Sequence, residues 1–312
     1  MVTIDMAFMI IFIIQTGVGG LGNSLLLGHY IFTYLNGHRL KPIDLLISHL
    51  AFVNTAVLFF KGIPQAMAAF GVSNFLDDTG CKLVIYLHRV ARSLSLFTTS
   101  FLSGFQAITI NSRSATCVNF KARMPKFIVP SCFLFWAFSL LTHGTILLYI
   151  RGPRDSRNST KRNVYIYCSS FYTSGNISVF TVITSLLDMV HVGIMVWTSG
   201  FMVLILYRHH QQTHYIHQNN FTPGGAPETR AIQTVLLLVS MFVFFYMINS
   251  VMSGYMNFFK PSPWFVHTSA FLAACYSACS PFVFIMSNSQ VLRYCVTFWQ
   301  RIKAPILTLA LG

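Results

Sequence analysis

The sequence predicts an all-α membrane protein: a bundle of seven transmembrane helices with a short amphipathic surface helix at its C-terminal end. Of its 312 residues, 54% are hydrophobic and only 9% are Asp, Glu, Lys or Arg, against about 25% charged residues in an ordinary soluble domain. Seven stretches are long enough to cross a hydrocarbon core, which takes about 20 residues of helix. The connections between them are short and leave no room for a soluble domain. Residues 1–312 are therefore expected to form a single domain.

The seven stretches follow one another with turn signals between them. The first one lacks a basic segment before it and is too long for the apolar part of a cleavable signal peptide, so we expect a signal-anchor helix. Connections such as 36–42, 71–81 and 260–264 contain the Gly, Pro and Asn residues that are typical of turns. In order, the stretches are Met6–Phe32, Ile43–Phe70, Leu83–Ile110, Phe127–Ile150, Ile177–Tyr207, Ala231–Phe259 and Phe265–Ser287.

The segment after the seventh stretch has apolar residues at helical spacing with polar residues among them. The apolar set is Val291, Leu292, Cys295, Phe298 and Ile302, and the polar set is Arg293, Gln300 and Arg301. This pattern predicts an amphipathic helix that lies on the cytoplasmic membrane surface. Cys295 is a candidate for palmitoylation there, and the alternative is an unmodified buried thiol.

The distribution of charges and cysteines indicates the orientation of the chain. A net charge of +14 in a membrane protein reflects Lys and Arg retained in cytoplasmic loops, rather than nucleic-acid binding. If the N-terminus lies outside the cell, the cytoplasmic loops contain more Lys and Arg residues than the outer loops do, although the basic run 151–162 in an outer loop opposes this bias. Cys81 and Cys168 then share the outer side, where a disulfide persists, and Asn158 is a candidate glycosylation site there. We expect a plasma-membrane protein with a cytoplasmic C-terminus.

Several ordered motifs point to one family. The longest is GCKLVIYLHRVARSLSLFTTSFLSGFQAITINSRSA (80–115). The others are LGN (21–23), KGIPQAMAAFG (61–71), ILYRHHQQTHYIH (205–217), PETRAIQTVLLLVS (227–240) and ACYSACSPFVF (274–284). Over essentially the whole chain these motifs resemble the type 1 vomeronasal receptors, a pheromone-receptor family among the G-protein-coupled receptors. The resemblance implies a small pheromone-like ligand, an inhibitory-class heterotrimeric G protein as partner, and no cofactor.

Departures from neighbouring families support that resemblance. Rhodopsin-like receptors generally place Asp in helix two and NPxxY in helix seven, where this chain has Asn54 and Ser280-Pro-Phe-Val-Phe. Olfactory receptors end helix three in a MAYDRYVAIC-like run, which is absent here. Bitter-taste receptors are the alternative within this class. A small transporter is the alternative outside it, although transporters usually show paired repeats.

Ionisable residues inside the predicted membrane helices are candidates for ligand binding, because burying a charge in a bilayer is costly. Those in the outer half are Lys61, His88, Arg89, Arg92, Asp188 and His191. Fixed cations outnumber acids in this set, which favours a ligand that is amphipathic and has an acidic end. The alternative is that Lys61 or Arg89 extends to the headgroups while Arg92 pairs with Asp188 structurally.

The predicted cytoplasmic face carries a second basic set. The candidates for contact with a G-protein α-subunit are Arg113, Lys121, Arg123, Arg208 and Arg230, and attraction to anionic lipid is the alternative role. The nearby run His209, His210, His214 and His217 could place three imidazoles on one helix face. A polar cytoplasmic extension is the preferred interpretation, so we expect no metal site. No motif pairs a nucleophile with a base, so we expect no enzyme.

Overall fold

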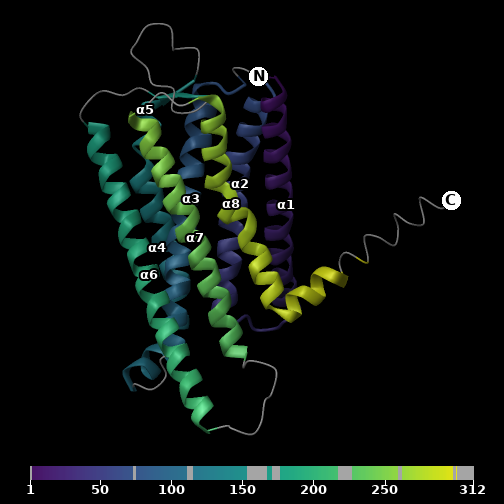
Figure 1. The fold of residues 1–312 in the computed structure, drawn as a ribbon, viewed down its shortest axis with the longest axis vertical. Coiled ribbons are helices and arrows are strands. Elements are labelled where there is room, and N and C mark those ends of the chain that lie inside the picture. The colour runs from purple at the N-terminus through teal and green to yellow at the C-terminus, as the bar shows by residue number, and fades with distance from the viewer. Residues whose placement is uncertain are drawn as a thin grey trace, which may run out of the picture.

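The computed structural model describes residues 2–72, 75–110, 115–152, 167–170, 176–216, 227–258, 262–297 and 300. Seven long helices form a bundle (Figure 1). They are α1 (Val2–Leu35), α2 (Pro42–Ala69), α3 (Asp78–Ile110), α4 (Ala115–His143), α6 (Asn176–Ile216), α7 (Pro227–Phe258) and α8 (Pro263–Ser287). The predicted seven-helix architecture is thereby confirmed. A one-turn helix, α5 (Ile146–Tyr149), and the two-residue strands β1 (Ile150–Arg151) and β2 (Ser169–Ser170) were not predicted.

Helix α3 runs through the middle of the bundle and packs against α2, α4, α6 and α7. Beside its buried apolar residues it buries many uncharged polar side chains: Ser93, Ser95, Thr98, Thr99, Ser100, Ser103 and Gln106. Within the described residues, the other six long helices are apolar enough to cross a membrane by composition, and α3 is not. The reason is that neighbouring helices rather than lipid surround α3, so its hydroxyls find partners inside the bundle.

A chain of two polar contacts through His49 joins α2, α3 and α4. The indole Nε1 of Trp136 donates to His49 Nε2 at 2.9 Å, and His49 Nδ1 lies 3.0 Å from Thr98 Oγ1. Because the Thr98 hydroxyl donates to the Leu94 carbonyl, His49 Nδ1 is the donor in the contact with Thr98. This neutral chain fixes the three helices relative to one another.

Two glycines allow α1 to approach its neighbours closely. A Cβ atom at Gly19 would lie 2.7 Å from the Ala278 Cα atom of α8. A Cβ at Gly62 of α2 would overlap the Thr16 hydroxyl of α1. Both pairs therefore meet in the way that small residues permit in membrane bundles.

Helices α4 and α6 end at other residues than predicted. Helix α4 starts at Ala115 and stops at His143. Gly144 then begins a turn that leads into α5 and β1, where Ile150 pairs with Ser170 of β2.

Helix α6 has 41 residues and is about 61 Å long, which is roughly twice the hydrocarbon thickness of a bilayer. It touches α3 where Thr198 Oγ1 lies 2.6 Å from Ser103 Oγ. Its last turns carry His209, His210 and His214, whose side chains lie outside the described residues, as does the whole of His217.

A short helix at 289–297 follows α8 and turns away from the bundle (Figure 1). Asn288 precedes it, and the Asn288 side-chain oxygen accepts from the Gln290 backbone N–H at 3.0 Å. Val291 is fully buried, whereas Leu292 and Val296 are exposed. This helix matches the predicted C-terminal surface helix.

Candidate functional site: a polar cavity near the centre of the bundle

A buried polar cluster joins four helices at the centre of the bundle. Asn54 of α2 donates to Ser280 Oγ of α8 at 2.8 Å, and the Asn54 amide oxygen accepts from Ser95 at 2.7 Å and from Ser277 at 3.2 Å. Asn23 of α1 donates to the Ser277 carbonyl at 2.9 Å. Asn54 is fully buried and neutral, so this cluster is satisfied without a charge.

A narrow cavity opens next to this cluster, between α2, α3, α7 and α8. Its polar lining residues are Arg92, Ser95, Tyr246, Asn249, Tyr276 and Ser277. Two of them, Ser95 and Ser277, also bond Asn54. The cavity has a volume of about 30 Å³, which is room for one or two water molecules. A ligand must therefore displace side chains to enter it.

Arg92 is the charged residue of the cavity, and two neutral residues of α7 hold it. The Asn249 amide oxygen accepts from both terminal nitrogens of Arg92 at 3.1 Å, an amide orientation that follows from these contacts. The guanidinium also lies 5.5 Å from the centre of the Tyr246 ring, a cation–π distance. The Tyr246 hydroxyl in turn donates to Asp188 of α6 at 3.3 Å. Arg92 and Asp188 are thus brought together around Tyr246.

His88 and Lys61 belong to the next layer toward the disulfide. His88 lies one turn from Arg92 on the same face of α3, and Lys61 lies one turn from the cavity residue Val57 on α2. His88 is only 7% exposed, and Lys61 and Arg92 both act electrostatically on it. The buried His88 Nε2 atom has no hydrogen-bond partner among the described residues. This layer therefore places basic groups next to the cavity, although neither residue lines it.

Arg89 and His191 do not line the cavity, although Arg89 acts electrostatically on His88 and Asp188. On either side of Arg89 along α3, Tyr86 bonds the Leu140 carbonyl and Ser93 bonds Ser139, so Arg89 lies on the α4 side, where it is exposed. The ring of His191 lies 4.3 Å from the Phe97 ring, and His191 is not among the residues that line the cavity.

Sequence reasoning missed the uncharged half of this site. Tyr246 and Asn249 recur with Phe242 at i, i+4 and i+7 on α7, which is one helix face. Phe242 stacks on Tyr246 and meets the Tyr276 ring edge-on at 4.7 Å, and the Tyr276 hydroxyl lies 2.9 Å from Thr99 Oγ1. Polar aromatic residues at helical spacing were the available signal, but they are common in membrane helices.

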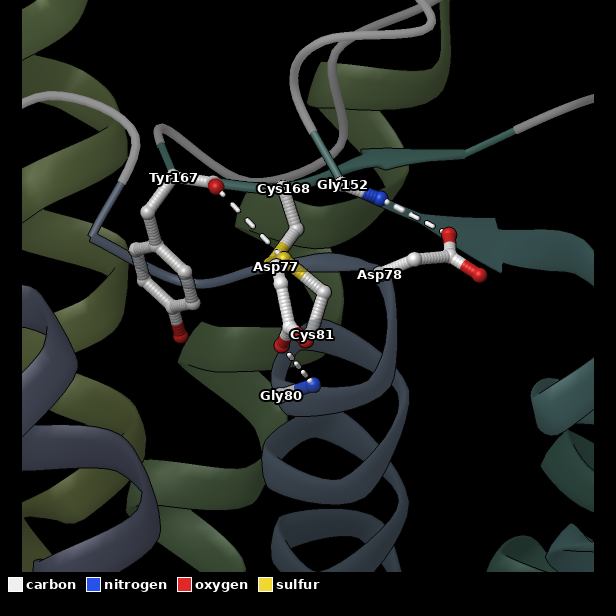
Figure 2. Close-up of a disulfide and its surroundings, with 7 residues drawn as sticks. All are labelled: Asp77, Asp78, Gly80, Cys81, Gly152, Tyr167 and Cys168. Atoms are coloured by element: carbon white, nitrogen blue, oxygen red, sulfur yellow. Dashed lines mark hydrogen bonds between the residues drawn. A yellow bond between two sulfur atoms is a disulfide. The ribbon is translucent and has the colours of Figure 1, made fainter.

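The paired strands β1 and β2 form a hairpin, and a disulfide ties it to the start of α3 (Figure 2). The predicted bridge joins Cys81 and Cys168, and both cysteines are buried. A second tether lies beside it, since the Gly152 N–H donates to an Asp78 carboxylate oxygen at 3.1 Å. The Tyr167 ring packs next to the bridge in an apolar cluster. The hairpin is thus fixed at this end of α3, which we call the disulfide end.

Two of the predicted partner-binding residues have described side chains, and both lie at the opposite end of the bundle. Arg123 and Arg208 are exposed, as contact with a partner requires. Arg113 and Asn158 lie outside the described residues, as do the side chains of Lys121 and Arg230. Cys295 of the surface helix is half-buried against the main apolar core, and this burial raises the pKa of its thiol.

Comparison with known proteins gives matches along the whole chain. A family model described as the vomeronasal organ pheromone receptor family matches residues 6–297. Vomeronasal type-1 receptor 1 of Homo sapiens is 44% identical over 285 residues, which cover 91% of this chain and 81% of that protein. Olfactory receptor class A-like protein 1 of Danio rerio is 34% identical over 283 residues, covering 90% of this chain and 89% of its own.

A solved structure gives the same architecture. Squid rhodopsin superposes with a TM-score of 0.74 and covers 97% of this chain and 87% of its own, at 15% sequence identity. At that identity the likeness concerns the fold alone.

Proposed function

The chain belongs to the vomeronasal organ pheromone receptor family, and from this premise we propose a ligand and a partner for it. The ligand is a small amphipathic molecule with an anionic end, and the partner is a heterotrimeric G protein of the inhibitory class. Family and fold make the chain a multi-pass membrane receptor of the G-protein-coupled class, and not an enzyme. This assignment excludes the two alternatives, a bitter-taste receptor and a small transporter.

The observation that carries the proposed ligand charge is the set of basic residues in and next to the cavity. Arg92 lines the cavity, and Lys61 and His88 lie next to it. Asn249 and Tyr246, which carry no charge, contact Arg92 directly, and Asp188 is the one carboxylate set against Lys61, Arg89 and Arg92 among the candidate residues. An anionic group at this point would offset the cost of placing guanidinium and ammonium groups in the bundle.

Apolar and aromatic residues supply the remainder of the binding surface. Val57, Phe242, Phe245 and Leu272 line the same cavity as Arg92, and small-molecule sites typically combine such walls with a few polar groups. The unpartnered His88 Nε2 atom offers a further hydrogen bond to the ligand. An amphipathic molecule fits both kinds of surface.

The residues shared by the cavity and the buried polar cluster support a way to couple ligand binding to the arrangement of the helices at the other end of the bundle. Ser95 and Ser277 face the cavity and share the amide oxygen of Asn54. A ligand that moves α3 relative to α8 would strain the hydrogen bonds that Ser95 and Ser277 donate to Asn54. It would then favour a different helix arrangement in which both bonds are restored.

The proposed orientation places the disulfide end outside the cell, because a Cys81–Cys168 bridge persists in an oxidising compartment. The C-terminal helix with Cys295 then lies on the cytoplasmic membrane surface. Arg123 and Arg208 become part of the G-protein contact, with Arg113, Lys121 and Arg230 as further candidates. The inhibitory class of that G protein rests on the family resemblance.

The test is a cell assay with reporters for several Gα classes and matched pairs of ligands. Each pair contains a carboxylic acid and its neutral methyl ester. We expect the acids to be the better agonists and the inhibitory-class reporter to respond. Arg92→Ala should weaken an acid by about 2–5 kcal/mol, at least about 30-fold in potency, and should leave the ester unchanged.

Arg89→Ala is the matched control, because Arg89 lies one turn from Arg92 but on the α4 side of the helix. At equal surface expression it should keep the potency of the acids. If esters act as well as acids and Arg92→Ala changes neither, the ligand is not anionic. If another Gα reporter responds instead, the partner class is wrong while the ligand proposal stands.

A further inference from the structure

Asp188 lies where an acidic residue is least expected, in the interior of the long helix α6. Among the acidic residues with described side chains, the other three, Asp44, Asp77 and Asp78, lie in or next to the first turn of α2 or α3. Asp188 instead lies within the apolar stretch Ser185–Ile205, which is long enough to span a membrane. A half-buried carboxylate at such a position is costly and needs a compensating charge.

The compensating charge comes from Arg92, and Tyr246 connects the two residues. The Arg92 guanidinium lies over the Tyr246 ring, 5.5 Å from its centre, and the Tyr246 hydroxyl donates to Asp188 Oδ2 at 3.3 Å. Arg92 and Arg89 both act electrostatically on the Asp188 carboxylate, and Arg92 has the larger effect. These contacts link α6 to α3 and α7 beside the cavity, which is lined by Arg92 and Tyr246 but not by Asp188.

An anionic ligand in the cavity and the Asp188 carboxylate would compete for the same guanidinium. The Arg92 side chain has a limited number of N–H donors, and the Asn249 amide oxygen already accepts from both of its terminal nitrogens. Two negative charges near one guanidinium also repel each other, and inside the bundle this repulsion is only weakly screened. The ligand therefore binds best when Asp188 moves away from Arg92, and α6 moves with it.

We propose that Asp188 is the internal counter-ion of Arg92 and determines which ligand charge the receptor prefers. Without agonist, the Asp188 carboxylate neutralises Arg92 and holds α6 against α7 through Tyr246. The anionic end of an agonist takes the place of this carboxylate at Arg92, and the released α6 favours the signalling arrangement of the helices. This inference rests on the proposed function and adds to it the residue that a neutral ligand would leave in place.

The first measurement needs no ligand. Basal signalling is recorded with reporters for several Gα classes, at equal surface expression of every variant. Asp188→Asn removes the charge that holds α6, so basal signalling should rise at least about fivefold, the lower end of coupling between two sites. Tyr246→Phe removes only the connecting hydroxyl and should also raise it, whereas Asp188→Glu keeps the charge and should stay close to the wild type. Arg92→Gln combined with Asp188→Asn should raise it by less than the sum of the two single effects, because both substitutions break one interaction.

The second measurement uses the pairs of carboxylic acid and methyl ester. Asp188→Asn removes the charge that opposes the acid, so the ratio of acid potency to ester potency should rise at least about fivefold. The ratio cancels any change in basal activity, because such a change acts on both members of a pair alike. Tyr246→Phe is the matched control, since it keeps both charges and should keep the ratio of the wild type.

The outcomes separate this inference from the proposed function. If the wild type prefers acids and Asp188→Asn changes neither basal signalling nor the ratio, the counter-ion is overturned and the ligand proposal stands. An equal rise of the ratio in Asp188→Glu would also overturn it, because the effect would then not depend on charge. If the wild type responds equally to acids and esters while Asp188→Asn raises basal signalling through Arg92, the ligand class is wrong and the counter-ion stands. If Asp188→Asn does not reach the cell surface, an unchanged basal level in Tyr246→Phe overturns the inference.

Discussion

The close approach of α1 and α8 at Gly19 yields a stability prediction with a built-in control. Gly19→Ala would place a Cβ 2.7 Å from the Ala278 Cα atom and 2.9 Å from Leu58 Cδ1. The Leu58 side chain can move, but the Ala278 atom belongs to a helix backbone. Because carbon atoms pack best at about 3.5–4.0 Å, the two helices would have to separate by about 1 Å.

Gly20→Ala is the comparison, since a Cβ at Gly20 meets no atom within 4 Å. Both substitutions gain the same helix propensity, up to about 1 kcal/mol, so their difference isolates the overpacking at Gly19. Overpacking of this kind costs about 1–3 kcal/mol. At roughly 2–4 °C per kcal/mol for a chain of 150–250 residues, Gly19→Ala should unfold several degrees below Gly20→Ala.

Thermal unfolding of the two purified receptors in one detergent measures this difference, with surface expression as a second readout. Separation of α1 from α8 should also weaken the bond from Asn23 to the Ser277 carbonyl, so agonist response should fall in Gly19→Ala alone. Equal midpoints for the two variants would show that α1 and α8 do not approach each other as described.

The remaining contacts and thiols give four shorter predictions. Asn54→Leu removes three side-chain hydrogen bonds and should cost about 2 kcal/mol at about 0.6 kcal/mol each, seen as a lower unfolding midpoint; an unchanged midpoint would contradict the cluster. Cys81→Ala, Cys168→Ala and the double variant should lose the same stability, up to about 4.6 kcal/mol for a loop of 87 residues, and unequal losses would argue against the pairing. Cys295→Ala should abolish hydroxylamine-sensitive acylation, and persistent acylation would place the lipid elsewhere. An epitope after Gly312 should react only in permeabilised cells, whereas labelling of intact cells would reverse the proposed orientation.

Much of the fold was predictable, because six helices carry the long apolar runs that lipid contact demands. The helix α3 was found from the sequence although it is polar, since its length and its place between turns remained visible. The ends of α4 and α6 were not predictable. Apolar residues continue past His143 into α5 and β1, and the polar residues up to Ile216 continue α6 beyond any membrane.

The site shows where sequence reasoning stops. Arg89 and Arg92 are three residues apart, but one faces α4 and the other faces the cavity, and only the packing of neighbouring helices decides which. Asn249 and Tyr246 hold Arg92 although they carry no charge, so a search for ionisable residues passes over them. Their role depends on how α7 is rotated against α3, which the composition of α7 leaves open.

The length of α6 turns small motions near the cavity into larger ones at the other end of the molecule. Thr198 contacts Ser103 of α3, and a rigid tilt of α6 about this contact would move its two ends in opposite directions. Asp188 lies ten residues to one side of it, about 15 Å, and Ile216 lies eighteen residues to the other side, about 27 Å. A rigid tilt that shifts Asp188 by about 1 Å therefore swings the tip of the helix by about 1.8 Å in the opposite direction. In such a tilt the turns of α6 beyond Ile205, where its membrane-spanning stretch ends, would move further than Asp188 does.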